Sequence, residues 1–335
     1  MKKGLIAAVG VLVVVVIALA LYFGRTRPTP NGNVPNAPLK VSVRMKWFFA
    51  GTMTGWFAGK EEGIFRRHGI DLTIRPGGPD NSSVKLVAAG TDQFGVAGAD
   101  EVLLARAKGV PVVAIGVLFK ESPICFISKK NKGIKTPADW AGKTVEVSYG
   151  SNAETEYRAL VAKFNVQNIK EVPYTFNLVP FIEDKVDVSV AYRMDQVVTL
   201  QRKGIALSII TSKEYGINPY GDVVITTEKT PKAQPEIVKQ FMEAVVESQR
   251  WAIHNPGPAV QQLVAQAGGS LTTDNEGAVW QATIPFLLAD GGETMICMMS
   301  SSRWEETQAV LTGTGALKSP VDLDQAVKQV IPETR

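Results

Sequence analysis

The sequence predicts an α/β fold of two lobes, joined by a hinge of two chain segments and preceded by an N-terminal membrane segment. Three observations predict it. Strand and helix patterns alternate from residue 39 to 221, strand–glycine–helix turns recur at 94–101 and 144–152, and the pattern after residue 226 is helical. Alternation of strands and helices is typical of α/β sheets.

Length and charge limit the class of protein. A chain of 335 residues is long enough for two domains of ordinary size. Four of the 36 basic residues lie before residue 34, so the remaining 32 match the 32 acidic residues and residues 34–335 carry no net charge. The sequence pI of about 8.9 is therefore an N-terminal effect, and it does not indicate a nucleic-acid partner.

The N-terminus has the pattern of an export signal. Lys2 and Lys3 precede an apolar run over 5–23, which is long enough to span a membrane. We expect an uncleaved anchor, and cleavage after Ala18-Leu19-Ala20 is the alternative. Residues 25–38 are rich in Pro and Asn, so they predict a disordered tether. The globular part is expected outside the cytoplasm, in the periplasm or at the cell surface.

The first lobe opens with a βαβ unit. Residues 39–45 alternate apolar and polar side chains, a helix pattern covers 54–68, and 70–74 form the next strand, which predicts parallel pairing. Three aromatic residues follow the first strand, and alternation sends neighbours to opposite sides. We choose Trp47 first for ligand contact and include Phe49 in the candidate site.

The turn at residues 98–101 puts two carboxylates at the end of the strand 94–97 and the start of a helix. In an open α/β sheet, ligands bind in the crevice at the carboxyl ends of the strands. Asp100 and Glu101 are therefore candidate ligand contacts. The alternative for Asp100 is a plain helix cap.

The second lobe has a similar entrance. The strand 144–148 runs into Gly150, and Ser151 and Glu154 have the spacing of a capping box. Backbone donors at this helix start could hold an anionic group, so Gly150 and Asn152 enter the candidate site. Further strands are expected at 124–128, 172–176, 186–191 and 205–210.

Three more residues complete the candidate site. Tyr192 directly follows a strand, Ser122 lies where the chain first crosses between lobes, and Asp222 lies at the second crossing. The strand 222–226 would return the chain to lobe 1, so lobe 1 comprises 39–122 and 222–335, and lobe 2 comprises 123–221. Such a two-segment hinge permits closure around a ligand. The helices expected after it cover 237–251, 261–267, 275–287, 302–311 and 322–330.

Several longer motifs resemble a known family, the NMT1/THI5-like periplasmic binding proteins. The matching stretches are MKWFFAGTMTGWFAGKEEGIFRRHGIDLTI, AAGTDQFGVAGADEVLLARAKGVPVVAIG, GIKTPADWAGKTVEVSYGSN, KVDVSVAYRMDQV and SPVDLDQAV. The resemblance implies a type II binding-protein fold and delivery of a small molecule to an ABC permease. The ligand it implies first is a pyrimidine or vitamin-precursor heterocycle, because Asp100 and Asp222 accept hydrogen bonds from ring donors and repel anions. Taurine or another sulfonate, or nitrate, is the alternative.

The family also contains enzymes that use a lysine-bound pyridoxal phosphate. At the positions of their lysine and histidine this chain has Ala97 and Glu101, and it has no cysteine over 218–222. We therefore expect no enzyme, no cofactor and no metal, and a monomer. A tethered ligand sensor is the third alternative. Cys125 and Cys297 lie in apolar surroundings, which favours free thiols over a single bridge.

Overall fold

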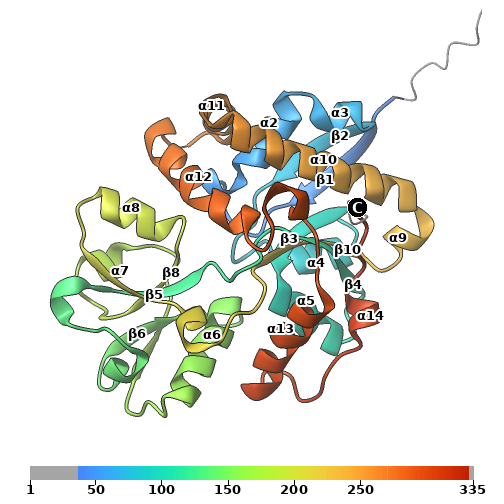
Figure 1. The fold of residues 1–335 in the computed structure, drawn as a ribbon. Coiled ribbons are helices and arrows are strands. Elements are labelled where there is room, and N and C mark those ends of the chain that lie inside the picture. Colours follow the sequence, from blue (N-terminus) through green and yellow to red (C-terminus); the bar gives the residue numbers. More distant parts are fainter. Residues whose placement is uncertain (1–36, 270, 332–335) are drawn as a thin grey trace, which may run out of the picture. The chain divides into compact units, whose positions relative to one another are not determined.

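A computed structural model describes residues 37–269 and 271–331 of the chain (Figure 1). The predicted membrane segment over 5–23, and nearly all of the predicted tether, lie outside these residues. Within the described ranges, no helix is long and apolar enough to cross a membrane.

A five-stranded sheet forms the first part of the fold, in the order β2-β1-β3-β10-β4. β1 pairs in parallel with both β2 and β3, as the βαβ pattern predicts, whereas β10 runs antiparallel to β3 and β4. The chain therefore returns to this sheet at β10 after building the second part. The strands are β1 Leu39–Arg44, β2 Ile70–Arg75, β3 Phe94–Gly98, β4 Val112–Val117 and β10 Asp222–Thr227.

Helices cover both faces of this sheet. Residues of β3 alternate between them: Phe94 packs with the long helix α10 (Pro235–His254), and Ala97 packs on the other side with α5 (Ala99–Ala107). The remaining helices of this part are α2 Thr54–Glu61, α3 Ile64–Arg67, α4 Ser83–Ala88, α9 Thr230–Ala233, α11 Pro256–Ala267, α12 Thr273–Leu288, α13 Ser301–Gly313 and α14 Leu323–Ala326, with 3-10 turns η1 Gly51–Met53 and η5 Gly292–Met295.

Two predicted helices are shorter in the structure. The helix expected over 54–68 breaks into α2 and α3, because Gly63 adopts a left-handed conformation with φ 66°. The helix expected over 322–330 ends at Ala326, because Val327 becomes extended and bridges to Ala114 of β4. In both places a local backbone conformation interrupts an otherwise helical side-chain pattern.

The second part of the fold is built around β5, the central strand of the antiparallel sheet β8-β5-β9, with the parallel pair β6-β7 beside it. Alternate residues of β5 enter two cores: Phe126 packs with Trp140 and Tyr157, and Cys125 packs with Phe181. The elements are β5 Ile124–Lys129, β6 Thr144–Val147, β7 Lys170–Pro173, β8 Ser189–Tyr192, β9 Leu207–Ile210, α6 Asn152–Lys163, α7 Val179–Ile182, α8 Gln196–Arg202, and 3-10 turns η2 Lys130–Lys132, η3 Pro137–Trp140 and η4 Ser212–Tyr215.

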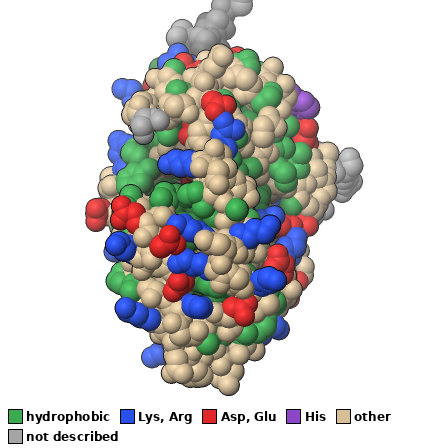
Figure 2. Space-filling model, turned by 90° about the vertical axis from the view of Figure 1, so that its left-hand side faces the viewer, with side chains coloured by type: hydrophobic (Ala, Val, Ile, Leu, Met, Phe, Trp, Pro, Cys, Tyr) green, Lys and Arg blue, Asp and Glu red, His purple; other side chains and the backbone are tan. Residues whose placement is uncertain are grey.

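Acidic and basic side chains are mixed on the surface shown in Figure 2. Lys129 and Lys132, for example, pair with Asp184 and Asp187. This face therefore carries no single-sign basic patch, in agreement with the charge balance of residues 34–335. The two cysteines are buried free thiols. The lobe boundaries and the hinge remain predictions, although the sheets divide near the same crossings.

Candidate functional site

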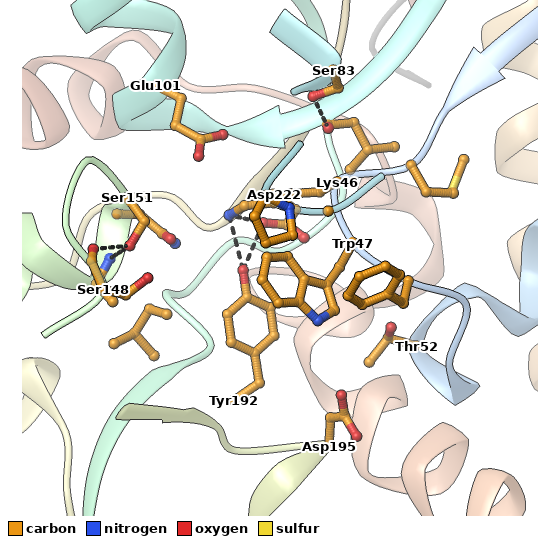
Figure 3. Close-up of a pocket in the computed structure, with 18 of the residues that line it drawn as sticks. Lys46, Trp47, Thr52, Ser83, Glu101, Ser148, Ser151, Tyr192, Asp195 and Asp222 are labelled. Atoms are coloured by element: carbon orange, nitrogen blue, oxygen red, sulfur yellow. Dashed lines mark hydrogen bonds and ion pairs between the residues drawn. The ribbon is translucent and has the colours of Figure 1, made fainter. Parts of the chain in front are cut away.

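A cavity of about 460 Å³ lies between the two parts of the fold and is lined by residues of both (Figure 3). Segments after β1 and at the start of β10 form one wall. Segments before α6 and after β8 form the other. Of the nine predicted site residues, the structure brings six to this lining: Trp47, Glu101, Gly150, Asn152, Tyr192 and Asp222.

Lys46 is at the centre of the cavity, and sequence reasoning missed it. Its Nζ donates to Tyr192 Oη at 2.9 Å and to Asp222 Oδ1 at 3.0 Å, so β1, β8 and β10 meet at one ammonium group (Figure 3). Burial lowers the pKa of Lys46, but electrostatic interactions, first with Asp222 and then with Tyr192, Glu101 and Asp100, outweigh burial and raise the pKa well above its ordinary value. Lys46 is therefore held as a cation whose charge Asp222 neutralises.

Aromatic rings form another wall of the cavity. Trp47 lies 5.4 Å from Phe176, ring centre to ring centre, so the contact joins the segment after β1 to the segment after β7. Phe176 is 45% exposed and has a φ of 60°. A bulky residue in this region of backbone conformation is strained, and such strain concentrates at functional sites. Phe176 is a second residue that the sequence did not single out.

The two acidic residues in the turn after β3 make different contacts. Glu101 accepts a hydrogen bond from the Gly98 N–H at 2.8 Å and lines the cavity, so it is the carboxylate that caps α5. Asp100 neither caps the helix nor lines the cavity: it is buried and accepts a hydrogen bond from Thr155 of α6 at 3.3 Å. A Cβ at Gly98 would lie 2.5 Å from Asp100 Oδ1, so a larger residue at this position would force the Asp100 side chain to move.

Phe49 does not line the cavity either. Its ring packs edge-on against Phe57 of α2 at 5.0 Å and belongs to the first core. The prediction extended strand alternation beyond residue 45, but β1 ends at Arg44 and the chain then turns toward η1. Past the end of a strand, the two-residue period no longer assigns side chains to faces.

The Ser122 side chain forms a hydrogen bond in the interior of the protein. Its hydroxyl donates to Glu156 of α6, and the Ser212 hydroxyl donates to the other oxygen of the same carboxyl. Ser122 lies on the first crossing segment, and Ser212 begins η4 in the second part of the fold. The structure therefore gives Ser122 a role in tying a crossing segment to α6, away from the cavity lining.

The buried Glu156 carboxyl makes stability depend on pH. Burial raises its pKa from 4.5 to about 8, and the two serine hydroxyls only partly offset this. Because the folded state keeps a proton that the unfolded state has released, the free energy of unfolding should fall as pH rises from 4.5 toward 8.

We expect Glu156→Gln to flatten this decline, measured as melting temperature across that pH range. Some slope should remain, because burial also raises the pKa values of Asp100 and Asp195 to about 7. Glu305→Gln, at an exposed position of α13, is the control. An unchanged pH slope in Glu156→Gln would contradict the assignment.

The start of α6 is a poorer anion site than the sequence predicted. The Gly150 N–H already donates to Glu154 at 2.8 Å, and the Ala153 N–H donates to Ser151 at 3.2 Å. A carboxylate thus takes the place where an anion would be expected. Asn152 differs: it is 7% exposed, lines the cavity, and its side chain makes no hydrogen bond to the described residues.

The sequence of this chain matches a known protein family. A family model described as NMT1/THI5 like matches residues 51–259, more than half of the chain. The chain belongs to the NMT1/THI5-like family. The family assignment made from the motifs is therefore confirmed.

Relatives of this NMT1/THI5-like chain include binding proteins and an enzyme. The riboflavin-binding protein RibY of Chloroflexus aurantiacus is 24% identical over 97% of both chains. The 4-amino-5-hydroxymethyl-2-methylpyrimidine phosphate synthase of Legionella pneumophila is 25% identical over 74% of this chain and 79% of its own.

The fold is also seen in solved structures. The alkanesulfonate-binding protein SsuA from Xanthomonas axonopodis pv. citri, bound to MOPS, superimposes with a TM-score of 0.68. The match covers 87% of this chain and 99% of that one at 16% identity. The chain therefore has the α/β periplasmic-binding-protein fold that the sequence predicted.

Proposed function

We propose that this protein is the extracytoplasmic solute-binding component of an ABC importer, and that it holds a flat heterocycle bearing N–H or O–H donors. The proposal depends on one observation: several carboxylate groups line the cavity, and each has an oxygen that accepts no hydrogen bond from the described residues. The ligand class we propose is that of flavins and pyrimidines.

The hydrogen-bonding groups of the cavity favour donors on the ligand. Glu101, Asp195 and Asp222 each use one carboxylate oxygen on a protein donor, and the other oxygen accepts no hydrogen bond from the described residues. Acceptors that lack donors are costly when a ligand closes the site, so a ligand rich in N–H or O–H groups gains most. A sulfonate would meet these oxygens with oxygens of its own.

The cation in the cavity does not reverse this argument. Lys46 is the lysine at the centre of the site, and its charge is already balanced by Asp222 at 3.0 Å. A sulfonate or nitrate would have to compete with Asp222 for the ammonium. This weighs against the anion-binding alternative, even though a sulfonate-binding protein shares the fold.

The size and the aromatic wall favour a fused or substituted ring system. A volume of about 460 Å³ falls within the range of about 300–1,000 Å³ typical of pockets for drug-sized ligands. Trp47 and Phe176 offer ring faces on which a flat ligand can stack. The likeness to a riboflavin-binding protein over 97% of both chains supports a flavin as the first ligand to test.

Binding without chemical change is the second part of the proposal. Ala97 is fully buried in the core of β3, so the family position that carries a lysine in the enzymes offers no amine here. The one lysine at the centre of the cavity, Lys46, is held as an ammonium, which has no lone pair for attack. We propose that the protein acts as a monomer without a cofactor.

Export and delivery complete the proposal. The apolar run over 5–23 would anchor the protein to the membrane, and 25–38 would tether the binding fold near an ABC permease. Lobe 1 would comprise 39–122 and 222–335 and lobe 2 would comprise 123–221, with closure about the two crossing segments.

A ligand panel tests the function directly. Melting temperature is measured with riboflavin, a hydroxymethylpyrimidine, taurine and nitrate, since a ligand at 100 times its dissociation constant adds about 2.7 kcal/mol to stability. We expect a rise with riboflavin or the pyrimidine and none with the two anions. A rise with taurine alone would replace the heterocycle by a sulfonate.

A substitution at Phe176 separates binding from stability. Phe176→Gly removes a stacking surface and also relieves the positive φ, so we expect the affinity for riboflavin to fall roughly two- to tenfold with no loss of melting temperature. Calorimetric titration and thermal unfolding give the two readouts. Asn168→Gly is the matched control, because Asn168 has the same φ of 60° and does not line the cavity. Equal affinities for both variants would exclude Phe176 as a ligand contact.

A further inference from the structure

The cavity has a second polar end at Asp195 and Thr52, which lie within the family motifs but were not among the candidate site residues. Asp195 follows β8 and precedes α8, whereas Thr52 lies in η1 after β1, so the two side chains come from opposite walls. Figure 3 shows both on the other side of the Trp47 ring from Glu101 and Ser148. Glu276 of α12 connects them: it accepts a hydrogen bond from the Gly51 N–H, next to Thr52, and its charge acts on Asp195. A ring stacked on Trp47 can extend a substituent toward this end.

The hydrogen bonds around Asp195 leave one of its oxygens for a ligand. Its Oδ2 accepts from Gln196 Nε2 at 2.7 Å, and Gln196 Oε1 accepts from the Tyr192 N–H at 2.7 Å, so both atoms of the Gln196 amide are engaged. Asp195 Oδ1 and the Thr52 hydroxyl make no hydrogen bond to the described residues. One acceptor and one hydroxyl thus face the cavity together.

The charges near Asp195 keep its carboxyl partly protonated. Burial first, and then the negative charge of Glu276 on α12, raise the pKa of Asp195 to about 7, and the hydrogen bond from Gln196 opposes this. Tyr174 is the other titratable group that interacts with Asp195. Glu276 is itself occupied, since its oxygens accept from the Gly51 N–H at 2.6 Å and Asn275 Nδ2 at 2.9 Å.

A group that both donates and accepts matches this end best. A protonated Asp195 and the Thr52 hydroxyl can each donate as well as accept, and a ligand hydroxyl has the same two capacities. An ammonium group only donates, so it could not accept a hydrogen bond from the protonated Asp195. An anionic group would meet Asp195 and the charge of Glu276.

We propose that Asp195 and Thr52 form a subsite for a hydroxyl-bearing chain attached to the ring system of the ligand. The inference rests on the proposed function, because it assumes that a flat ring occupies the Trp47 wall. A chain hydroxyl bound there would bridge the two walls of the cavity. Asp195 and Thr52 would then set the preference for ligands with a polyol substituent over those with the ring alone.

Two flavins that differ only in this substituent test the subsite. Riboflavin carries a chain of hydroxyl groups where lumiflavin carries a methyl group, and both are titrated by calorimetry against the full chain. We expect the unmodified protein to prefer riboflavin by about tenfold, the effect of one to two hydrogen bonds. Asp195→Ala and Thr52→Val should each reduce this preference to less than threefold, by lowering the riboflavin affinity more than the lumiflavin affinity.

The control is Ser148→Ala, which changes a hydroxyl at the opposite end of the cavity. It should leave the riboflavin preference as it is. The proposal is overturned if the preference survives both Asp195→Ala and Thr52→Val, or if Ser148→Ala removes it. Lumiflavin binding reports the ring site separately, so its absence would overturn the flavin assignment itself.

Discussion

Asp222→Ala should lower the free energy of unfolding by about 3–5 kcal/mol, because it leaves the Lys46 ammonium buried without its counter-charge. The two side chains are 13% and 9% exposed and 3.0 Å apart, so the pair is largely buried in the wall of the cavity. Urea unfolding of the ligand-free protein measures the loss. We also expect weaker ligand binding, since Asp222 lines the cavity.

Two comparisons make this result specific. Asp71→Ala removes the partner of Arg66, but those side chains are 44% and 72% exposed, so the loss should stay below about 1 kcal/mol. The double variant Lys46→Met with Asp222→Ala removes both charges and should recover much of the stability lost by Asp222→Ala alone. If the double variant is no more stable than Asp222→Ala, the unpaired charge is not the cause.

Phe241→Ala should cost about 3–5 kcal/mol, the range for removing a large buried aromatic side chain. Phe241 of α10 is fully buried and stacks on Phe94 of β3 at 3.8 Å between ring centres. The same side chain contacts Trp56 and Phe65, so the hole it leaves cannot collapse easily. The effect should appear as a large drop in the urea midpoint.

Phe48→Ala is the matched control, because Phe48 is 52% exposed at the rim of the cavity. Its loss should change the free energy of unfolding by less than about 1 kcal/mol. Similar losses for the two variants would mean that the stacked cluster around α10 contributes no more than a surface ring.

The sequence predicted the elements that local patterns determine. The parallel pairing of β1 with β2, the helix after Gly98 and the amphipathic α10 all follow from periodicity and turn chemistry, and each is present in the structure. Strand ends also placed Tyr192 and Asp222 at the cavity. Because strand ends gather at the edge of a sheet, a residue's position at the end of a strand is enough to place its side chain at that edge.

The missed residues depend on contacts between distant segments. Lys46 becomes notable only because Tyr192 and Asp222, 146 and 176 residues away, converge on it. The pKa of Asp195 is raised by burial and then by the charge of Glu276 on α12, 81 residues further along the chain. A lone Lys before an aromatic run, or a lone Asp before a helix, has no local pattern that distinguishes a binding residue from a surface charge.

Two of the predicted site residues that lie away from the cavity lining do so for the same physical reason. Asp100 lies in the turn after β3 and Ser122 at a crossing point, but α6 packs against both, and Thr155 and Glu156 of α6 form internal hydrogen bonds with them. Chain order shows that the residues are near the interface between the two parts. It does not show which side of that interface opens to solvent and which side is sealed by a helix.

The position of Trp47 gives the molecule a built-in optical reporter. Of its six tryptophans, Trp47 and Trp56 line the cavity, whereas the others lie elsewhere in the fold. A flavin stacked on the Trp47 ring would absorb the light that the indole emits, and a colourless pyrimidine would not. The loss of indole fluorescence can therefore distinguish the two ligand classes in the unmodified protein, without a label.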